Sequence, residues 1–194
     1  MAPVTRFYVT TPIYYVNAEP HIGHTYTTIV VDTLARYHRM AGEETFFLTG
    51  TDEHGEKVAE VAAQRGLSPR EFTEQISGTF RSTWEELGLS FDHFIRTTDP
   101  YHVRTVQTIL QSVYDAGEIE FREYEGLYCV GCERFLTDRD MEDGLCRDHE
   151  RAPERRKESN YFFKMSAHFD WLVDHGVPFD ISWPDFVHYA RLLA

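Results

Sequence analysis

The sequence has little that would place it in a membrane, in a secretory pathway or on a polyphosphate. Across its 194 residues no apolar run approaches the roughly 18 residues that a membrane-spanning helix requires. Met1 to Thr5 lack a basic segment followed by an apolar core, so we predict no signal peptide. The 19 basic residues against 32 acidic ones give a net charge of −13, which disfavours sequence-independent binding to nucleic acid. We expect a cytoplasmic protein with no membrane partner.

Cysteine is also scarce, and its placement is informative. All three cysteines lie between residues 129 and 146, and an odd, clustered set is more typical of metal binding in a reducing compartment than of disulfides. Cys129 and Cys132 are followed, after 13 intervening residues, by Cys146 and His149. This spacing predicts one structural Zn²⁺ ion held by four protein ligands. Iron is the alternative metal, and buried thiols without a metal are the alternative interpretation.

The first part of the chain alternates short apolar strands with amphipathic helices. Strands are expected at 6–10, 45–49 and 94–97. Helical patterns begin at His21, before Val58, at Ser68 and at Thr98. The first helix has an apolar face of Tyr26, Ile29, Val30, Thr33, Leu34, Tyr37 and Met40. The third is expected to place Phe72, Ile76, Phe80 and Trp84 in a core, and the last to turn Val103, Val106, Ile109, Leu110 and Val113 inward.

This order of elements predicts an α/β fold, the first half of a Rossmann-like nucleotide-binding fold with a parallel sheet and right-handed crossovers. We expect that half-domain at residues 1–117, a zinc-binding insertion at 118–160, and a return strand and helices at 161–194. The last of these helices is expected after Pro184. The stretch 147–159 is dense in charge and is expected to be a solvated surface that pairs its own charges. In parallel sheets, ligands bind at the carboxyl ends of the strands.

The loop after the first strand leads to two histidines at a helix start. His21 and His24 are three residues apart, so both side chains share one face of the first turn. A helix N-terminus offers free N–H groups and positive partial charge, and imidazoles there can donate to phosphate oxygens. Gly23 removes a side chain where a flat ring can lie against the backbone. The pattern predicts a nucleoside triphosphate site, with two surface histidines that cap a helix as the alternative.

The second strand leads into a polar segment that is expected at the same sheet edge. Asp52 can hold a substrate ammonium group there, and an N-cap for the next helix is an equal alternative. Glu53 and His54 beside it can equally be solvated. Tyr14 and Tyr15 are adjacent in a loop, so both cannot enter one core, and one is expected to face a ligand.

Three segments together resemble bacterial-type methionyl-tRNA synthetases, which are class I aminoacyl-tRNA synthetases. These are YVTTPIYYVNAEPHIGH at 8–24, FFLTGTDEHG at 46–55 and EGLYCVGCERF at 125–135. The resemblance extends over nearly the whole chain. It implies a ligase that forms methionyl-adenylate from methionine and ATP, with Mg²⁺, and then transfers the methionyl group to its tRNA.

The same resemblance implies roles for particular residues. His21 and His24 would be the catalytic residues at the ATP phosphates, with Gly23 under the adenine. Asp52 would face the methionine amino group. Ile13 and Tyr15 would line the amino-acid pocket. The zinc module would belong to the connective insertion, near the acceptor end of the tRNA.

The sequence departs from the family pattern in its last part. Lys164 to His168 reads KMSAH, which echoes the family's second ATP motif, KMSKS. We interpret this as a coincidence, because the second lysine is absent and the segment follows the expected return strand. The later part of the methionine pocket and the anticodon-binding domain are also absent from the 194 residues. We therefore expect an amino-terminal part of the catalytic region, with weak or no adenylation by itself.

Two other functions are compatible with single motifs. A zinc-knuckle module that binds nucleic acid without catalysis would use Arg147, Arg151, Arg155, Arg156 and Lys157. Interleaved carboxylates leave that stretch close to neutral, which disfavours this hypothesis. A nucleotidyltransferase that joins a phosphate ester to a nucleotide would use the histidine pair, but it would explain neither the cysteines nor the Asp52 segment.

Overall fold

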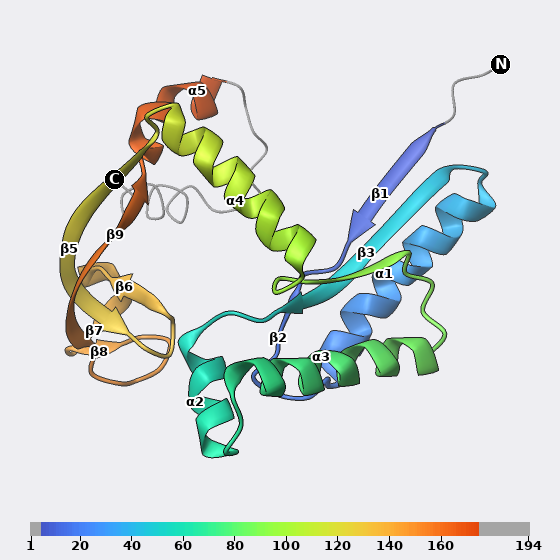
Figure 1. Ribbon diagram of the computed structural model, residues 1–194, viewed down its shortest axis with the longest axis horizontal. Coiled ribbons are helices and arrows are strands. Elements are labelled where there is room, and N and C mark those ends of the chain that lie inside the picture. Colours follow the sequence, from blue (N-terminus) through green and yellow to red (C-terminus); the bar gives the residue numbers. More distant parts are fainter. Residues whose placement is uncertain (1–4, 175–194) are drawn as a thin grey trace. The chain divides into compact units, whose positions relative to one another are not determined.

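The computed structural model describes residues 5–174, and its contacts divide the chain into two compact units, Met1–Thr105 and Val106–Ala194. Helix α4 (Pro100–Asp115) runs through the division (Figure 1). The helix expected after Pro184 lies outside the described residues.

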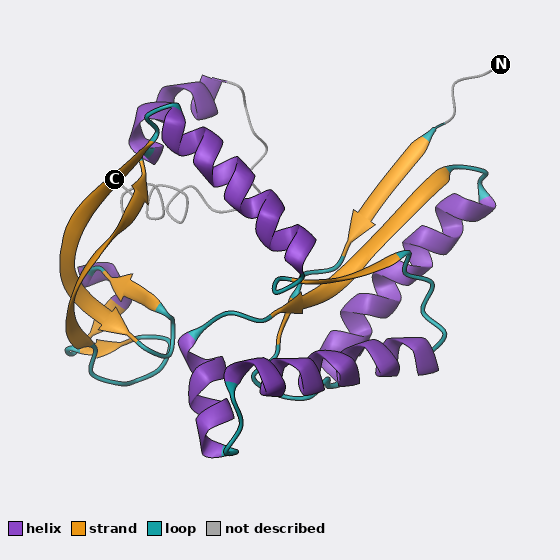
Figure 2. Cartoon of the chain, viewed as in Figure 1, coloured by secondary structure: helices purple, strands orange, loops and turns teal. Residues whose placement is uncertain are grey.

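A parallel sheet is the centre of the first unit. Its strands are β1 (Arg6–Thr10), β2 (Tyr14–Tyr15), β3 (Glu44–Asp52) and β4 (His93–Arg96). Each of the other three pairs with β3 in parallel register: β1 along its first half, β2 at its last two residues, and β4 along residues 48–51. Figure 2 shows these strands with the helices that pack beside them. The predicted parallel α/β fold is therefore confirmed.

Three helices complete the first unit, namely α1 (Ile22–Met40), α2 (Glu56–Gln64) and α3 (Pro69–Glu86). The predicted start of α3 is confirmed, because the Ser68 hydroxyl accepts from the Glu71 N–H at 3.3 Å and the Glu71 carboxylate accepts from the Ser68 N–H at 3.0 Å. The predicted core face of α3 is also confirmed. The core cluster consists of Tyr14, Val16, Val58, Ala62, Phe72, Ile76, Phe80, Trp84 and Phe94.

The apolar face of α1 is exposed in the described structure. The side chains that α1 buries are Thr28, Asp32 and Ala35, which are small or polar. Asp32 accepts from the Ser90 backbone N–H at 2.7 Å and from Arg36 Nε at 2.6 Å. A polar network therefore joins α1 to the segment before β4, and the large apolar residues lie on the other side. The exposed residues are Tyr26, Ile29, Val30, Leu34, Tyr37 and Met40.

The prediction that the apolar face of α4 turns inward is wrong for the described part of the chain. Helix α4 has no buried residue there, and Val106, Ile109 and Leu110 are exposed. The 3.6-residue period correctly predicts that a helix has an apolar face, but it carries no information on whether another element covers that face.

The second unit is built on an antiparallel sheet in the order β6-β5-β9, where β5 is Ile119–Cys129, β6 is Arg134–Leu136 and β9 is Glu154–Phe163. A small hairpin pairs β7 (Met141–Glu142) with β8 (Leu145–Cys146). The unit also contains the 3₁₀ turns η1 (Asp138–Asp140) and η2 (Met165–His168) and the short helix α5 (Phe169–Asp174).

The return strand begins earlier than the sequence suggests. Strand β9 starts at Glu154, inside the charge-dense stretch that we expected to pair with itself. Two of its cations reach across to β5, where Arg155 pairs with Glu125 at 2.6 Å and Lys157 with Glu123 at 2.9 Å. Arg156 pairs within the stretch, with Glu154 at 3.7 Å. Cross-strand charge pairs of this kind stabilise antiparallel ribbons, so the charge pattern here belongs to a strand.

Candidate functional site

The two histidines lie together at the start of α1. His21 is the N-cap, and its Nδ1 accepts from the Gly23 N–H at 3.1 Å, while Nδ1 of His24 accepts from the His21 N–H at 3.3 Å. The rings are stacked with centroids 3.8 Å apart. A nitrogen that accepts carries no proton, so in each neutral ring the proton is on Nε2, which then is a hydrogen-bond donor.

The capping role and a ligand-binding role are thus compatible, since they use different nitrogens of the same rings. His21 is exposed and His24 half-buried. Burial and the neighbouring His21 both lower the pKa of His24, which favours its neutral form. A Cβ on Gly23 would lie 3.0 Å from His21 Cε1, so the glycine leaves room for the His21 ring to fold back over the helix start.

Strand β2 links this helix start to the end of β3. The Tyr14 ring lies 4.8 Å from the His24 ring, and the Tyr14 hydroxyl is 2.8 Å from that of Thr28. Burial raises the pKa of Tyr14. The next residue, Tyr15, pairs in register with Asp52. The histidine pair and Asp52 are therefore tied to the same end of the sheet through two adjacent residues.

The structure separates the two adjacent tyrosines, as their sequence predicts. Tyr14 is 6% exposed and belongs to the core, whereas Tyr15 is 58% exposed. Ile13, which the family resemblance implies as a residue of the amino-acid pocket, is exposed.

Asp52 ends β3 and is half-exposed. Its Oδ1 accepts from the His54 backbone N–H at 3.4 Å. The alternative role as N-cap of α2 is wrong, because the N-cap of that helix is Gly55. The Asp52 carboxylate therefore remains in a position from which it can accept from a ligand.

Glu53 is the residue of this segment that sequence reasoning missed. It is 4% exposed and receives Arg96 in a bidentate ion pair, with Nε at 2.7 Å and Nη2 at 3.0 Å from the two carboxylate oxygens. The hydroxyls of Thr98 and Thr51 also donate to it. Burial by itself would raise the pKa of Glu53, but the hydrogen bonds from Arg96 and Thr98 outweigh burial and lower it. A charged side chain after a strand gave no indication in the sequence of its partner on β4.

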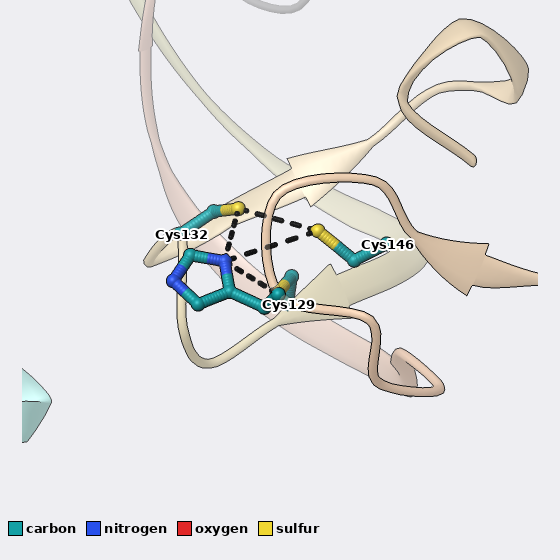
Figure 3. Close-up of side chains that lie close together, drawn as sticks. Cys129, Cys132 and Cys146 are labelled. Carbon is teal, nitrogen blue, oxygen red and sulfur yellow. Dashed lines mark hydrogen bonds between the residues drawn. The ribbon is translucent and has the colours of Figure 1, made fainter. Parts of the chain in front are cut away.

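The second unit brings the four predicted metal ligands together. Cys129 ends β5 and Cys146 ends β8, while Cys132 and His149 lie in turns. Their ligand atoms all lie within 4.8 Å of one another. Figure 3 shows the three cysteine side chains converging from these segments.

The distances fit a tetrahedral ion. Sulfurs bound to one zinc ion at about 2.3 Å lie about 3.8 Å apart, and here the sulfurs of Cys132 and Cys146 are 3.5 Å apart. Nδ1 of His149 lies 3.2 Å from the Cys132 sulfur and 4.0 Å from the other two. Burial and the adjacent thiols raise the pKa of Cys132 to about 12, so without a cation this thiol keeps its proton. A metal ion would supply the positive charge that replaces that proton.

Comparison with known proteins places the chain in a family. Residues 7–152 match the model of the family described as tRNA synthetases class I (M). The chain belongs to this family.

Two curated relatives are methionine–tRNA ligases. The chain is 47% identical over 169 residues to a methionine–tRNA ligase of Clostridium tetani, which covers 87% of this chain and 26% of the relative. It is 47% identical over 181 residues to a methionine–tRNA ligase of Caldanaerobacter subterraneus, covering 93% of this chain and 28% of the relative. The chain thus spans about a quarter of the length of these relatives.

A solved structure is similar over the same region. Mycobacterium tuberculosis methionyl-tRNA synthetase in complex with methionyl-adenylate matches with a TM-score of 0.83 and 39% identity, over 89% of this chain and 35% of that one.

None of the helices within residues 5–174 is both long and apolar enough to cross a bilayer.

Proposed function

We propose that this chain carries the ATP and methionine sites of a methionine–tRNA ligase. In the reaction, a methionine carboxylate oxygen attacks the α-phosphorus of ATP, and the bond to pyrophosphate breaks. The product, methionyl-adenylate, then gives its methionyl group to the terminal adenosine of a methionine tRNA. The name shared by the relatives, and the methionyl-adenylate in the similar solved structure, support this substrate pair.

One observation carries the proposal, namely the stacked histidine pair at the start of α1. With both Nδ1 atoms used by the backbone, His21 and His24 present Nε2–H groups that donate to phosphate oxygens as charge develops at phosphorus. The helix N-terminus contributes in the same sense, and Gly23 lies where the adenine approaches. Little covalent chemistry is required of the protein, because positioning and charge stabilisation carry phosphoryl chemistry of this kind.

The amino acid is held by groups at the same end of the sheet. Asp52 pairs with the methionine ammonium group, which brings the carboxylate of the substrate toward the phosphates. Ile13 and Tyr15 are exposed beside it and contact the methionine side chain. The Mg²⁺ ion arrives with ATP as part of the substrate.

The Cys129, Cys132, Cys146 and His149 cluster would hold one structural Zn²⁺ ion. A set of four sulfur and nitrogen ligands leaves no water position for catalysis. When bound, the ion cross-links the turns of this module. The acceptor end of the tRNA is expected to bind near this module.

The test uses a non-hydrolysable analogue of methionyl-adenylate and titration calorimetry. We expect the chain to bind this analogue, and the leucyl analogue to bind at least about tenfold more weakly, since the side-chain pocket discriminates between them. Replacing His24 with Asn or Asp52 with Asn should weaken binding. Equal binding of the two analogues would contradict the methionine assignment, and unchanged binding in both variants would contradict the site.

A further inference from the structure

Next to Asp52, the structure holds a buried charged group that the proposed reaction does not use. The Glu53 carboxylate accepts from Arg96, Thr98 and Thr51, and its side chain is fully buried. Replacing a buried ion pair with apolar residues of similar volume is often neutral or stabilising. The stability of the fold alone therefore does not account for the placement of this pair beside the substrate end of β3.

The contacts of Glu53 fix the backbone from several elements. The Glu53 N–H donates to the Thr97 hydroxyl at 2.9 Å, and the Thr97 N–H donates to the Thr51 carbonyl at 3.3 Å. The Thr51 hydroxyl is in turn 2.8 Å from that of Ser77 on α3. The peptide that joins Asp52 to Glu53 is thus held from Thr97, directly after β4, and, through Thr51, from α3.

Asp52 lies apart from the buried contacts of Glu53. Thr51, the residue before Asp52 in β3, is buried and donates to Glu53 at 3.0 Å. Neighbouring side chains of a strand point to opposite faces of the sheet, so Asp52 lies on the face away from Thr51. Among the described residues, Asp52 accepts only from the His54 N–H, at 3.4 Å. The Asp52 side chain is half-exposed, so its carboxylate is available to a cationic group from solvent.

We propose that the Glu53–Arg96 pair positions Asp52 for the substrate: by fixing the peptide between Asp52 and Glu53, it holds the Asp52 carboxylate toward the ammonium group of the amino acid. Both residues are positioning residues, because they act through Asp52. The proposal rests on the proposed function, since it takes methionine as the ligand of Asp52.

The first test is kinetic. The assay is methionine-dependent exchange of pyrophosphate into ATP. Glu53→Gln should raise the KM for methionine about tenfold or more, because even a small displacement of the Asp52 carboxylate weakens its contact with the substrate strongly. The KM for ATP should stay within about twofold, since the histidine pair is untouched. Arg96→Lys keeps the charge but loses the bidentate geometry, so its effect should be intermediate.

Asp32→Asn is the matched control. Asp32 is also a buried carboxylate of the first unit that is paired with an arginine, but it lies on α1 and contacts Ser90. A purely structural loss lowers the amount of active protein and hence the apparent kcat, without changing the KM for methionine. Asp32→Asn should therefore leave that KM unchanged. An unchanged methionine KM in Glu53→Gln overturns the proposal.

The second test does not depend on the reaction. Backbone ¹⁵N order parameters of residues 52–54 should be near about 0.85 in the original protein and fall below about 0.6 in Glu53→Gln, but not in Asp32→Asn. If the chain neither exchanges pyrophosphate nor binds the methionyl-adenylate analogue, the proposed function fails. The order parameters then decide the positioning proposal by themselves, and unchanged values overturn it.

Discussion

The two units of the molecule hold their chemically important side chains in different ways. At the end of β3 in the first unit, Glu53 is held entirely by protein groups, and this unit has a core cluster of large apolar residues. In the second unit, four ligand atoms meet on strand ends and turns, and the buried cluster there consists of Cys129, Leu136 and Cys146. The first site is determined by the fold, whereas the second contributes to its own fold through the ion that it would bind.

This difference follows from the amount of apolar surface available. The core of the first unit contains Trp84, Phe72 and Phe80. Burial of such large aromatic side chains is strongly stabilising and can offset the free energy required to desolvate and order a charged pair. A hairpin of two-residue strands has no comparable core. Small modules of that kind commonly depend on a metal ion for their stability.

The largest predicted effect is that of removing the metal, which should unfold part of one unit and leave the other folded. Treatment with a chelator should unfold residues 129–149 and leave the first unit folded, because the free energy of zinc binding in such modules is about 10–16 kcal/mol and is coupled to folding. The measurement is the dispersion of backbone amide resonances in each unit before and after chelation, with re-addition of zinc as the control. Native resonances of residues 129–149 in the metal-free protein would contradict the proposed dependence.

The second prediction concerns Gly50 in the middle of β3. An added Cβ would collide with the carbonyl oxygen of Ile95, its partner on β4. Gly50→Ala should therefore destabilise the first unit by about 3 kcal/mol, because the backbone of β4 has to move. Thermal unfolding measures this effect. Gly78→Ala on α3 is the control, since a Cβ there meets nothing within 4 Å, and it should be stabilising by about 0.5–1 kcal/mol.

The third prediction concerns Gly131, a glycine of the second unit that lies against the ring of His149. A Cβ on Gly131 would lie 2.5 Å from the ring of His149, so Gly131→Ala should displace that ligand. We expect a loss of about 10–100-fold in zinc affinity, measured by competition with a chromophoric chelator. The melting temperature of the first unit should not change. In the opposite sense, Gly50→Ala should leave zinc affinity intact, and loss of affinity in that variant would show that the two regions are coupled.

The same contrast explains which features of the structure can be predicted from the sequence. Periodicity and capping patterns predict the strands, the helices and the core face of α3, and ligand spacing predicts the Cys129–His149 cluster, because each of these features is local. The burial of Glu53 depends on Arg96, 43 residues away, and no local pattern reports such a pair. The predicted burial of the apolar face of α4 is wrong for a related reason, since exposure depends on what lies opposite a helix face.

The smallest expected effect is the acid sensitivity of the first unit. The pKa of Glu53 is lower in the folded protein than its ordinary value of 4.5, because hydrogen bonds from Arg96 and Thr98 outweigh burial. Between these two pKa values the unfolded chain binds a proton that the folded chain does not, so the stability contributed by Glu53 is present above pH 4.5 and is lost as the pH falls through the folded value.

Glu53→Gln provides the decisive comparison for this acid sensitivity. The variant lacks the titrating group at every pH, so it should melt at a lower temperature than the original protein at neutral pH. As the pH falls, protonation makes Glu53 of the original protein neutral as well, and the two melting curves should converge. Melting temperatures of both proteins between about pH 3 and pH 7 measure this difference. Curves that stay parallel over the whole range would mean that the pKa of Glu53 is the same in the folded and the unfolded protein, and hence that Arg96 does not stabilise its charge.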